Sequence, residues 1–377
     1  MLYKKKIIVT ANSSWNIVNF REGIVLELIS NGFEVVIVSP RDEFVPRLLD
    51  LGCYYININI DKKGVNPIND LYLLFQYLKI FYKERPDIVL SYTAKPNIYS
   101  SIAAGIYEIP VINNISGLGT AFIRGGLLGT IVSFLYRVSL RKSKCVFFQN
   151  NDDKILFLNK SLATENQVDI LPGSGVNLEY YQPLNSNIIN KNQGEFVFLL
   201  ITRLIWDKGI QEYVDAARLI KKYSSKVKFQ ILGFLDVDNQ TAVLHSDVDT
   251  WVEEGIIQYL GKTDDVRPFI NSSDCVVLPS YREGTPKILL EAAAMGKPII
   301  ATNVEGCKDV VDDGVNGYLC NVRDANDLSK KMKIMINIAS KDVEIMGLMG
   351  RQKMEREFDE KIVINKYISA VGKIIDK

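Results

Sequence analysis

The chain has 377 residues, of which 47% are hydrophobic and 24% are charged, and its formal net charge is +1. This composition is that of an ordinary globular protein, and the length exceeds the usual size of one domain, so we expect two domains. A net charge this close to zero excludes an affinity of the whole molecule for nucleic acid, so any electrostatic attraction must be local. The five cysteines are scattered without a C-x2-C pair, which favours buried reduced thiols over a metal site.

The N-terminus, MLYKKKIIVT, carries basic residues and a short apolar run that polar residues follow at once. A secretory signal needs a longer apolar region and a cleavage site of small residues, so this run is interpreted as a first buried strand. No segment reaches the ~20 apolar residues that a membrane-spanning helix requires. A cytoplasmic protein is therefore expected.

Strand-like apolar runs alternate with helical patterns through the first half of the chain. The predicted strands are 6–10, 33–39, 54–60, 87–92, 111–115, 145–149 and 168–171. The predicted helices are 20–29 (after a polar loop at 11–16), 42–51, 67–83, 96–107, 127–140 and 152–162. Strict alternation with continuous apolar strands predicts a parallel, doubly wound sheet.

A polar, Asn-rich stretch without periodicity then interrupts the pattern, and the alternation of strands and helices restarts at residue 196. The predicted elements of this second half are strands 196–201, 228–232, 256–260, 275–278, 298–301 and 317–320, and helices 210–222, 266–271, from 285, 308–311 and 327–338. The expected domains are residues 1–183, a linker at 184–195, residues 196–355, and a C-terminal helix within 356–377. Two such α/β domains would form a cleft facing the carboxyl ends of both sheets.

The strand predicted at 275–278 leads into the stretch SYREGTPKILLEAAAMG. Thr285 is expected to be the N-cap of the following helix, and Pro286 its first residue. Unpaired N–H groups and the positive end of the helix dipole make such a turn a candidate anion site. Glu283 in the loop and Glu291, about two turns into the helix, place two carboxylates near it.

This E-x7-E pair, with the Gly-Thr-Pro turn and the following KPIIATNVEGCKDVVDDGVNGYL, resembles the retaining nucleotide-sugar glycosyltransferases of family 4. The resemblance implies the GT-B fold, an α/β architecture in which two doubly wound Rossmann-like domains face each other across a cleft. It implies that Glu291 accepts hydrogen bonds from the donor ribose and that Glu283 lies by the donor sugar. The other residues implied for donor binding are Gly284, Thr285, Pro286, Ser13 and Ser14. It also implies that a C-terminal helix crosses back to the first domain.

Arg203 and Lys208, which follow the strand predicted at 196–201, match the R-x4-K pair that grips the donor diphosphate in this family. Fixed cations and helix N–H groups stabilise the charge that grows on a leaving diphosphate. No metal and no cofactor are therefore expected. The D-x-D sequence at 236–238 is interpreted as a solvated loop, and His245 as exposed and nonfunctional.

Three segments at strand ends of the first domain, SSWNIVNFR, SYTAKPN and NISGLGT, resemble bacterial O-antigen, capsule and N-glycan assembly transferases. Those enzymes include transferases that add N-acetylgalactosamine to a lipid-linked sugar. The residues implied for the acceptor are Arg21, Lys95, Asn97, Gly117 and Gly119. Some relatives carry a His before the Lys of the second segment, and Ala94 stands there in this chain.

The stretch 122–144 interleaves apolar residues with five cations and contains no acid. A basic amphipathic helix suits an anionic membrane surface, so Arg137, Arg141 and Lys142 are predicted membrane contacts. The alternative is an ordinary domain helix with a solvated basic end.

Taken together, these features predict a cytoplasmic, peripherally membrane-bound retaining glycosyltransferase. It would move a hexose or N-acetylhexosamine from a nucleotide sugar, with UDP-sugar as the expected donor, to an undecaprenyl-diphosphate-linked saccharide. A sugar-nucleotide 2-epimerase of the same shape would need more acid/base groups in the cleft. A nucleotide-sugar-binding protein without turnover would keep Arg203 and Lys208 but tolerate loss of Glu283. A dehydrogenase is disfavoured because no G-x-G-x-x-G follows the first strand.

Overall fold

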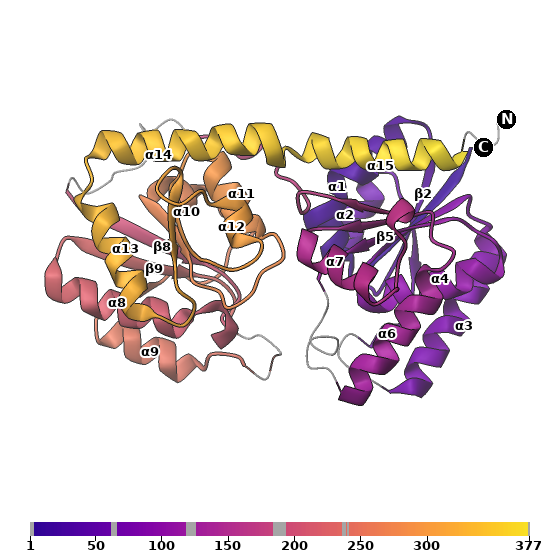
Figure 1. The fold of residues 1–377 in the computed structure, drawn as a ribbon, viewed down its shortest axis with the longest axis horizontal. Helices are drawn as coiled ribbons and strands as arrows, with labels where there is room; N and C mark the ends of the chain where they lie inside the picture. The colour runs from indigo at the N-terminus through magenta and orange to yellow at the C-terminus, as the bar shows by residue number, and fades with distance from the viewer. Residues whose placement is uncertain are drawn as a thin grey trace. The chain divides into compact units, whose positions relative to one another are not determined.

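The computed structural model describes residues 4–61, 66–117, 126–183, 194–235, 239 and 241–375. The chain divides into two compact units, each described by itself below (Figure 1). Unit 1 comprises residues 1–174 and 361–377, and unit 2 comprises residues 175–360. Unit 2 is thus longer than the predicted second domain, 196–355, because it also includes residues 175–183 and 356–360. Part of the reason is local, since Arg351 Nη1 donates to the Tyr181 carbonyl at 2.7 Å.

Unit 1 alternates strands with helices, as the apolar periodicity predicts. Its strands are β1 (Lys6–Thr10), β2 (Glu34–Ser39), β3 (Tyr54–Asn57), β4 (Ile88–Tyr92), β5 (Val111–Ile115), β6 (Cys145–Phe148) and β7 (Val168–Ile170). Its helices are α1 (Ser14–Ser30), α2 (Val45–Asp50), α3 (Pro67–Glu84), α4 (Ala94–Ile106), α6 (Gly126–Leu140), α7 (Asn151–Asn159) and α15 (Glu360–Ile375). All described strand pairs are parallel, in the order β3-β2-β1-β4-β5-β6-β7.

The sheet of unit 1 lies between two hydrophobic layers, because successive strand residues point to opposite faces. Ile7 and Val9 of β1 pack in a cluster with α1, α2 and α15. Ile8 belongs to the cluster on the other face, which α3, α4, α6 and α7 cover. Helix α15 buries Val363, Tyr367 and Val371, which lie one turn apart on one face. The Asn114 side-chain amide donates to the Tyr367 hydroxyl at 2.9 Å, which ties the C-terminal helix to β5.

Unit 2 repeats this architecture around a second parallel sheet of order β10-β9-β8-β11-β12-β13. Its strands are β8 (Phe196–Ile201), β9 (Val227–Leu232), β10 (Gln258–Tyr259), β11 (Cys275–Leu278), β12 (Ile299–Thr302) and β13 (Gly317–Cys320). Its helices are α8 (Ile210–Tyr223), α9 (His245–Glu253), α10 (Arg267–Ser272), α11 (Lys287–Ala294), α12 (Cys307–Val310), α13 (Ala325–Asn337) and α14 (Ser340–Lys353). One continuous buried cluster of strand and helix residues forms its core.

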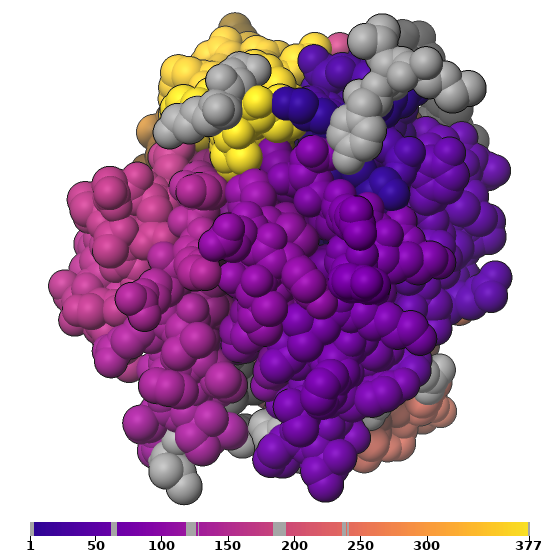
Figure 2. All heavy atoms as spheres, turned by 90° about the vertical axis from the view of Figure 1, so that its right-hand side faces the viewer, coloured from indigo at the N-terminus to yellow at the C-terminus, as the bar shows by residue number. Residues whose placement is uncertain are grey.

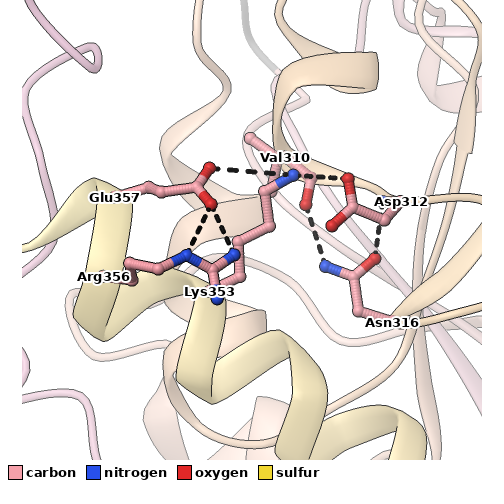
Figure 3. Close-up of polar contacts among 6 residues, drawn as sticks. All are labelled: Val310, Asp312, Asn316, Lys353, Arg356 and Glu357. Carbon is pink, nitrogen blue, oxygen red and sulfur yellow. Dashed lines mark hydrogen bonds and ion pairs between the residues drawn. The ribbon is translucent and has the colours of Figure 1, made fainter.

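The end of α14 is anchored by a buried lysine (Figure 3). Lys353 is almost fully buried, and its ammonium lies 2.6 Å from Oδ1 of Asp312, in the loop before β13. A π-helical turn, Met354–Phe358, follows and leads into α15. The Asn316 side chain holds the same loop closed by donating to the Val310 carbonyl and accepting from the Asp312 N–H.

Several predicted boundaries are wrong, and two of them have a clear local cause. Helix α1 begins at Ser14, so the expected polar loop at 11–16 ends early because the Ser13 hydroxyl caps the helix. Thr285 is not the N-cap of α11. Pro286 holds that place, and its carbonyl accepts the first helical hydrogen bonds from Leu289 and Leu290.

Helices α9 and α14 were not predicted, and α14 shows why. The sequence of α14 contains Gly347 and Gly350, and glycine lowers helix propensity. The structure explains Gly347, because a Cβ there would lie 1.9 Å from the Gly296 carbonyl oxygen. Close packing against the backbone before β12 therefore requires glycine at position 347, and this glycine weakens the helical pattern of the sequence.

Candidate active site

The strand order of unit 2 reverses between β8 and β11, which are neighbours in the sheet. Ligands of doubly wound sheets bind outside the carboxyl ends of the strands at such a switch point. The loop after β8 carries Arg203 and Lys208, and the loop after β11 carries Glu283. The topology therefore brings two segments far apart in the sequence to one end of the sheet.

Lys208 and Glu283 are in direct contact at this switch point. The Lys208 ammonium lies 2.5 Å from Oε1 of Glu283, and the two side chains are only 17% and 12% exposed. The backbone joins the same loops, because the Tyr281 N–H donates to the Asp207 carbonyl at 2.9 Å. Arg203 lies exposed directly after β8. Of the two cations after β8, Lys208 is thus paired and Arg203 is exposed.

Two glycines allow the strand-end loops to pack this closely. Gly306, before α12, has φ +76°, and a Cβ there would lie 1.4 Å from the Gly284 carbonyl oxygen. Gly209, before α8, has φ +71°, and a Cβ there would lie 2.0 Å from the Pro279 carbonyl oxygen. Only glycine combines the left-handed conformation with such an approach. The loop that holds Glu283 and Gly284 is therefore fixed from two sides by backbone contacts.

Glu291 belongs to a different set of contacts from Glu283. It is 6% exposed, and its carboxylate lies 3.4 Å from the Lys287 ammonium, one helical turn earlier. Burial raises the pKa of the Glu291 carboxyl above its ordinary value, although Lys287 and a hydrogen bond from Tyr181 act in the opposite direction. The Lys287 contact follows from i,i+4 spacing and could have been predicted, whereas the Tyr181 contact could not.

Tyr281 holds the loop after β11 in place through contacts that were not predicted from the sequence. The Tyr281 hydroxyl donates to the Glu212 carboxylate at 2.9 Å, and the Arg323 guanidinium lies 4.5 Å from the Tyr281 ring centre. Burial raises the pKa of Tyr281 to about 12, so its hydroxyl remains a donor at neutral pH. Tyr281 lies two residues before Glu283, but its partners lie on α8 and after β13, and no sequence signal marks them.

Two family models match the chain. One, described as glycosyl transferase 4-like, matches residues 6–150, and the other, described as glycosyl transferases group 1, matches residues 195–337. The chain belongs to the family 4 glycosyltransferases. The second match contains the Lys208–Glu283 pair and α11, so the group 1 segment carries the candidate donor site of this glycosyltransferase.

Curated relatives and a solved structure agree with this assignment. The chain is 27% identical to an N,N'-diacetylbacillosaminyl-diphospho-undecaprenol alpha-1,3-N-acetylgalactosaminyltransferase of Campylobacter jejuni, over 96% of each chain. It is 24% identical to a UDP-Gal:alpha-D-GlcNAc-diphosphoundecaprenol alpha-1,3-galactosyltransferase of Escherichia coli, over 79% of this chain and 78% of that one. A glycosyltransferase from Rickettsia africae superposes with a TM-score of 0.80 at 19% identity, covering 99% of both chains. The fold is therefore GT-B.

In unit 1, the predicted donor residues Ser13 and Ser14 begin α1 at the end of β1. The Ser13 hydroxyl accepts from the Asn16 N–H at 3.2 Å, as a helix cap. Ser14 is fully buried, and its hydroxyl contacts the Ser39 hydroxyl at 2.8 Å. Both hydroxyls thus already have protein partners.

The predicted acceptor residues lie near the carboxyl ends of β4 and β5. The Lys95 ammonium pairs with Asp70 of α3 at 2.5 Å. Asn97 is buried, and its amide donates to the Asn114 carbonyl at 2.8 Å. Gly117 has φ +147° with open space around it, whereas Gly119 lies outside the described residues. The structure thus gathers Lys95, Asn97 and Gly117 at one end of the sheet.

Arg21 is buried within α1 rather than open to solvent. Its guanidinium lies 4.7 Å from the centre of the Tyr92 ring, and Nη1 donates to the Phe20 carbonyl. Its Nε has no hydrogen-bond partner among the described residues. Arg21 is therefore close to the end of β4, but a ligand would need a local rearrangement to reach it.

The predicted membrane contacts lie at the C-terminal end of α6. Arg137 donates to the Lys160 carbonyl, and Lys142 to the Gly105 carbonyl. Arg137 and Arg141 line a groove of about 690 Å³ together with Lys144. The predicted basic stretch begins at residue 122, and its part up to 125 lies outside the described residues.

Two further predictions concern ligands and membranes. Residues 236–238, the D-x-D sequence, lie outside the described residues. Within the described ranges, no three His, Cys, Asp or Glu side chains are grouped so that they could hold a metal ion. No helix there is both long and apolar enough to span a bilayer. His245 is exposed at the start of α9, as predicted.

Proposed function

We propose that this glycosyltransferase moves a hexose or N-acetylhexosamine from a UDP-sugar to an undecaprenyl-diphosphate-linked saccharide, with retention, during assembly of a surface polysaccharide or glycan. The observation that carries the proposal is the Lys208–Glu283 pair at the switch point of unit 2. The names of the relatives support the lipid-linked acceptor, and one of them supports UDP.

In the proposed reaction the bond between the sugar C1 and the β-phosphate oxygen breaks, and C1 bonds to an acceptor hydroxyl. The proton of that hydroxyl passes to the leaving phosphate, so no protein base is assigned. Negative charge grows on the diphosphate as the bond breaks, and Arg203 and Lys208 stabilise it more than they stabilise the ground state. The N–H groups that open α11, near Gly284, Thr285 and Pro286, add to this effect. We expect turnover without a metal.

The two glutamates have separate roles in this proposal. Glu283 orients Lys208 toward the diphosphate and lies beside the donor sugar. Glu291, held by Lys287 and Tyr181, accepts hydrogen bonds from the ribose hydroxyls. Ser13 and Ser14 complete the donor contacts from unit 1.

We further propose that Lys95, Asn97, Gly117, Gly119 and Arg21 bind the acceptor. Lys95 is held by Asp70 in the structure, so acceptor binding would exchange this ion pair for contacts with the diphosphate or sugar. The protein then acts on the inner face of the cytoplasmic membrane, where Arg137, Arg141 and Lys142 contact anionic lipid.

A donor screen tests the catalytic proposal. The protein is incubated with detergent-solubilised lipid-diphosphate sugars and UDP-, GDP- or dTDP-sugars in EDTA, and nucleoside diphosphate release and lipid mass are measured. Turnover with a UDP-sugar in EDTA is expected. Lys208→Ala should lower kcat by about 100-fold or more, because it removes a charge contact made in the transition state. Lys222→Ala, an exposed lysine of α8, is the matched control.

The same assay separates an enzyme from a binding protein. Glu283→Gln should abolish product formation while the donor still raises the melting temperature. Full turnover by Glu283→Gln, or a strict requirement for added divalent metal, would contradict the proposed mechanism.

The membrane contact is tested by sedimentation with vesicles. Arg137, Arg141 and Lys142 changed together to Glu should release the protein from vesicles that contain anionic lipid. Unchanged sedimentation would refute the role of these three cations.

A further inference from the structure

Helix α3 is apolar on its outward face as well as on its buried face. Leu73, Tyr77 and Phe81 point into the core, as in an ordinary surface helix. The opposite face carries large apolar side chains at helical spacing, which we call the α3 stripe: Ile68, Leu71, Tyr72, Phe75 and Tyr82. Ile68, Phe75 and Tyr82 are 76%, 60% and 67% exposed. A helix that is apolar all round normally has cover on both sides, so the α3 stripe indicates a missing partner.

A second apolar stripe lies on α6, in the same helical layer. Leu128, Ile131, Phe134 and Val138 are exposed there, at spacings of three or four residues that place them on one face of the helix. Helices α3 and α6 both pack against α4, so they flank it on the same face of the sheet. Figure 2 faces this end of unit 1, with α3 in violet and α6 in magenta on the lower part of the view. Two exposed apolar helices thus share one side of the unit.

The exposed charged side chains on α3 and at the end of α6 are cations, and Glu108, just after α4, is an exposed acid beside them. The two acids of α3 are already paired, Asp70 with Lys95 and Glu84 with Lys6. The exposed positions of α3 include Lys79 and Lys83; α6 carries Arg137 in its last turn, and Arg141 directly follows the helix. An apolar surface bordered by cations, with aromatic side chains among its members, matches the interfacial region of an anionic bilayer.

The two stripes also lie where a membrane would help the proposed reaction. Helices α3 and α6 follow β3 and β5 in parallel βα units, so both start at the carboxyl end of the sheet. The predicted acceptor residues Lys95 and Asn97 lie at that end, and Asp70 of α3 holds Lys95. A lipid-linked acceptor would leave the bilayer beside these residues.

We infer that the α3 stripe inserts into the interface of an anionic bilayer, so that α3 and α6 together form the membrane-binding surface of unit 1. The inference rests on the proposed membrane association, but it does not depend on glycosyl transfer. It assigns the apolar part of the binding to α3, whereas the α6 cations supply the electrostatic part.

The test is flotation of the full chain with vesicles of phosphatidylethanolamine and phosphatidylglycerol. Tyr72→Gln with Phe75→Gln should lower the partition coefficient by about tenfold or more, at both low and high salt. The control is Ile345→Gln with Leu348→Gln on α14, which removes two apolar side chains that are 46% and 52% exposed. Control binding should match the unaltered protein. Unchanged binding of the α3 variant, or an equal loss in the control, would overturn the inference.

A second measurement does not depend on loss of binding. Phe75→Trp should show stronger quenching by brominated lipids than the unaltered protein, because the added indole enters the bilayer. No added quenching would overturn the inference.

Sedimentation velocity tests whether a second copy of the chain covers the α3 stripe instead. The inference would be overturned if the unaltered protein formed a dimer, the α3 variant were monomeric, and both bound vesicles equally. Turnover of the α3 variant on detergent-solubilised acceptor should stay normal. The donor screen can find no turnover while the α3 variant still binds vesicles more weakly than the unaltered protein. In that case the membrane inference stands and the catalytic proposal fails.

Discussion

The Lys208 ammonium and the Glu283 carboxylate lie 2.5 Å apart although 75 positions separate them in the chain. This contact joins the loops after two adjacent strands at the switch point of unit 2. Both side chains are mostly but not fully buried, so the net contribution of this ion pair to the free energy of unfolding should be modest but measurable.

A double-mutant cycle measures this contact. Lys208→Gln and Glu283→Gln should each lower the free energy of unfolding by about 1–2 kcal/mol, since each leaves a largely buried charge without its partner. The double variant should lose less than the sum of the two. Urea denaturation provides the values, and additivity within about 0.5 kcal/mol would show that the pair does not contribute.

Gly306 should be irreplaceable, because its backbone meets the Gly284 carbonyl. Gly306→Ala is expected to cost about 3 kcal/mol or more and to weaken donor binding, since a Cβ would force the loop that holds Glu283 to move. Gly314→Ala is the matched control: Gly314 has nearly the same backbone angle, φ +78°, but open space around it, so only about 1 kcal/mol of backbone strain is expected. Equal costs in urea denaturation would contradict the close packing.

Glu291 should make stability depend on pH. Its pKa is raised in the folded state, so the folded protein binds more protons than the unfolded chain between the ordinary value of 4.5 and the raised one. Stability from this group is therefore present below pH 4.5 and is lost as the pH rises through that window, at about 1.4 kcal/mol per unit of difference. Glu291→Gln should remove this slope, as measured by urea denaturation from pH 4 to 7.5.

Tyr181→Phe gives an independent check on the same carboxyl. The Tyr181 hydrogen bond lowers the pKa of Glu291, so its removal should raise that pKa further and extend the window to higher pH. Parallel pH profiles for the unaltered protein and Glu291→Gln would refute the raised pKa.

Lys353 should stabilise unit 2 mainly through its buried stem (Figure 3). Its partner Asp312 is about half exposed, so Asp312 can return to water when the ion pair is lost. Lys353→Met, which keeps most of the stem, should therefore cost less than about 1 kcal/mol, whereas Lys353→Ala should cost about 2–3 kcal/mol. Denaturation of both variants decides the point, and equal losses would assign the effect to the charge.

The alternation of apolar strands and amphipathic helices was readable because each element repeats with its own period, and the family motif fixed Arg203, Lys208, Glu283 and Glu291 as candidates. The prediction of element boundaries was wrong where a single hydrogen bond decides the boundary, as at Ser13. The prediction missed α14 because tertiary packing there requires Gly347, which has a low helix propensity.

The doubly wound architecture and the family could be predicted from the sequence alone, since both depend on local periodicity and on contiguous motifs. The pairing of Lys208 with Glu283, the contacts of Tyr181 and Lys287 with Glu291, and the exposed apolar stripe of α3 became known only from the folded structure. The reason is physical: pairing and exposure depend on which distant segments the strand order brings together. A helical pattern that is apolar on both faces cannot say which face the protein covers.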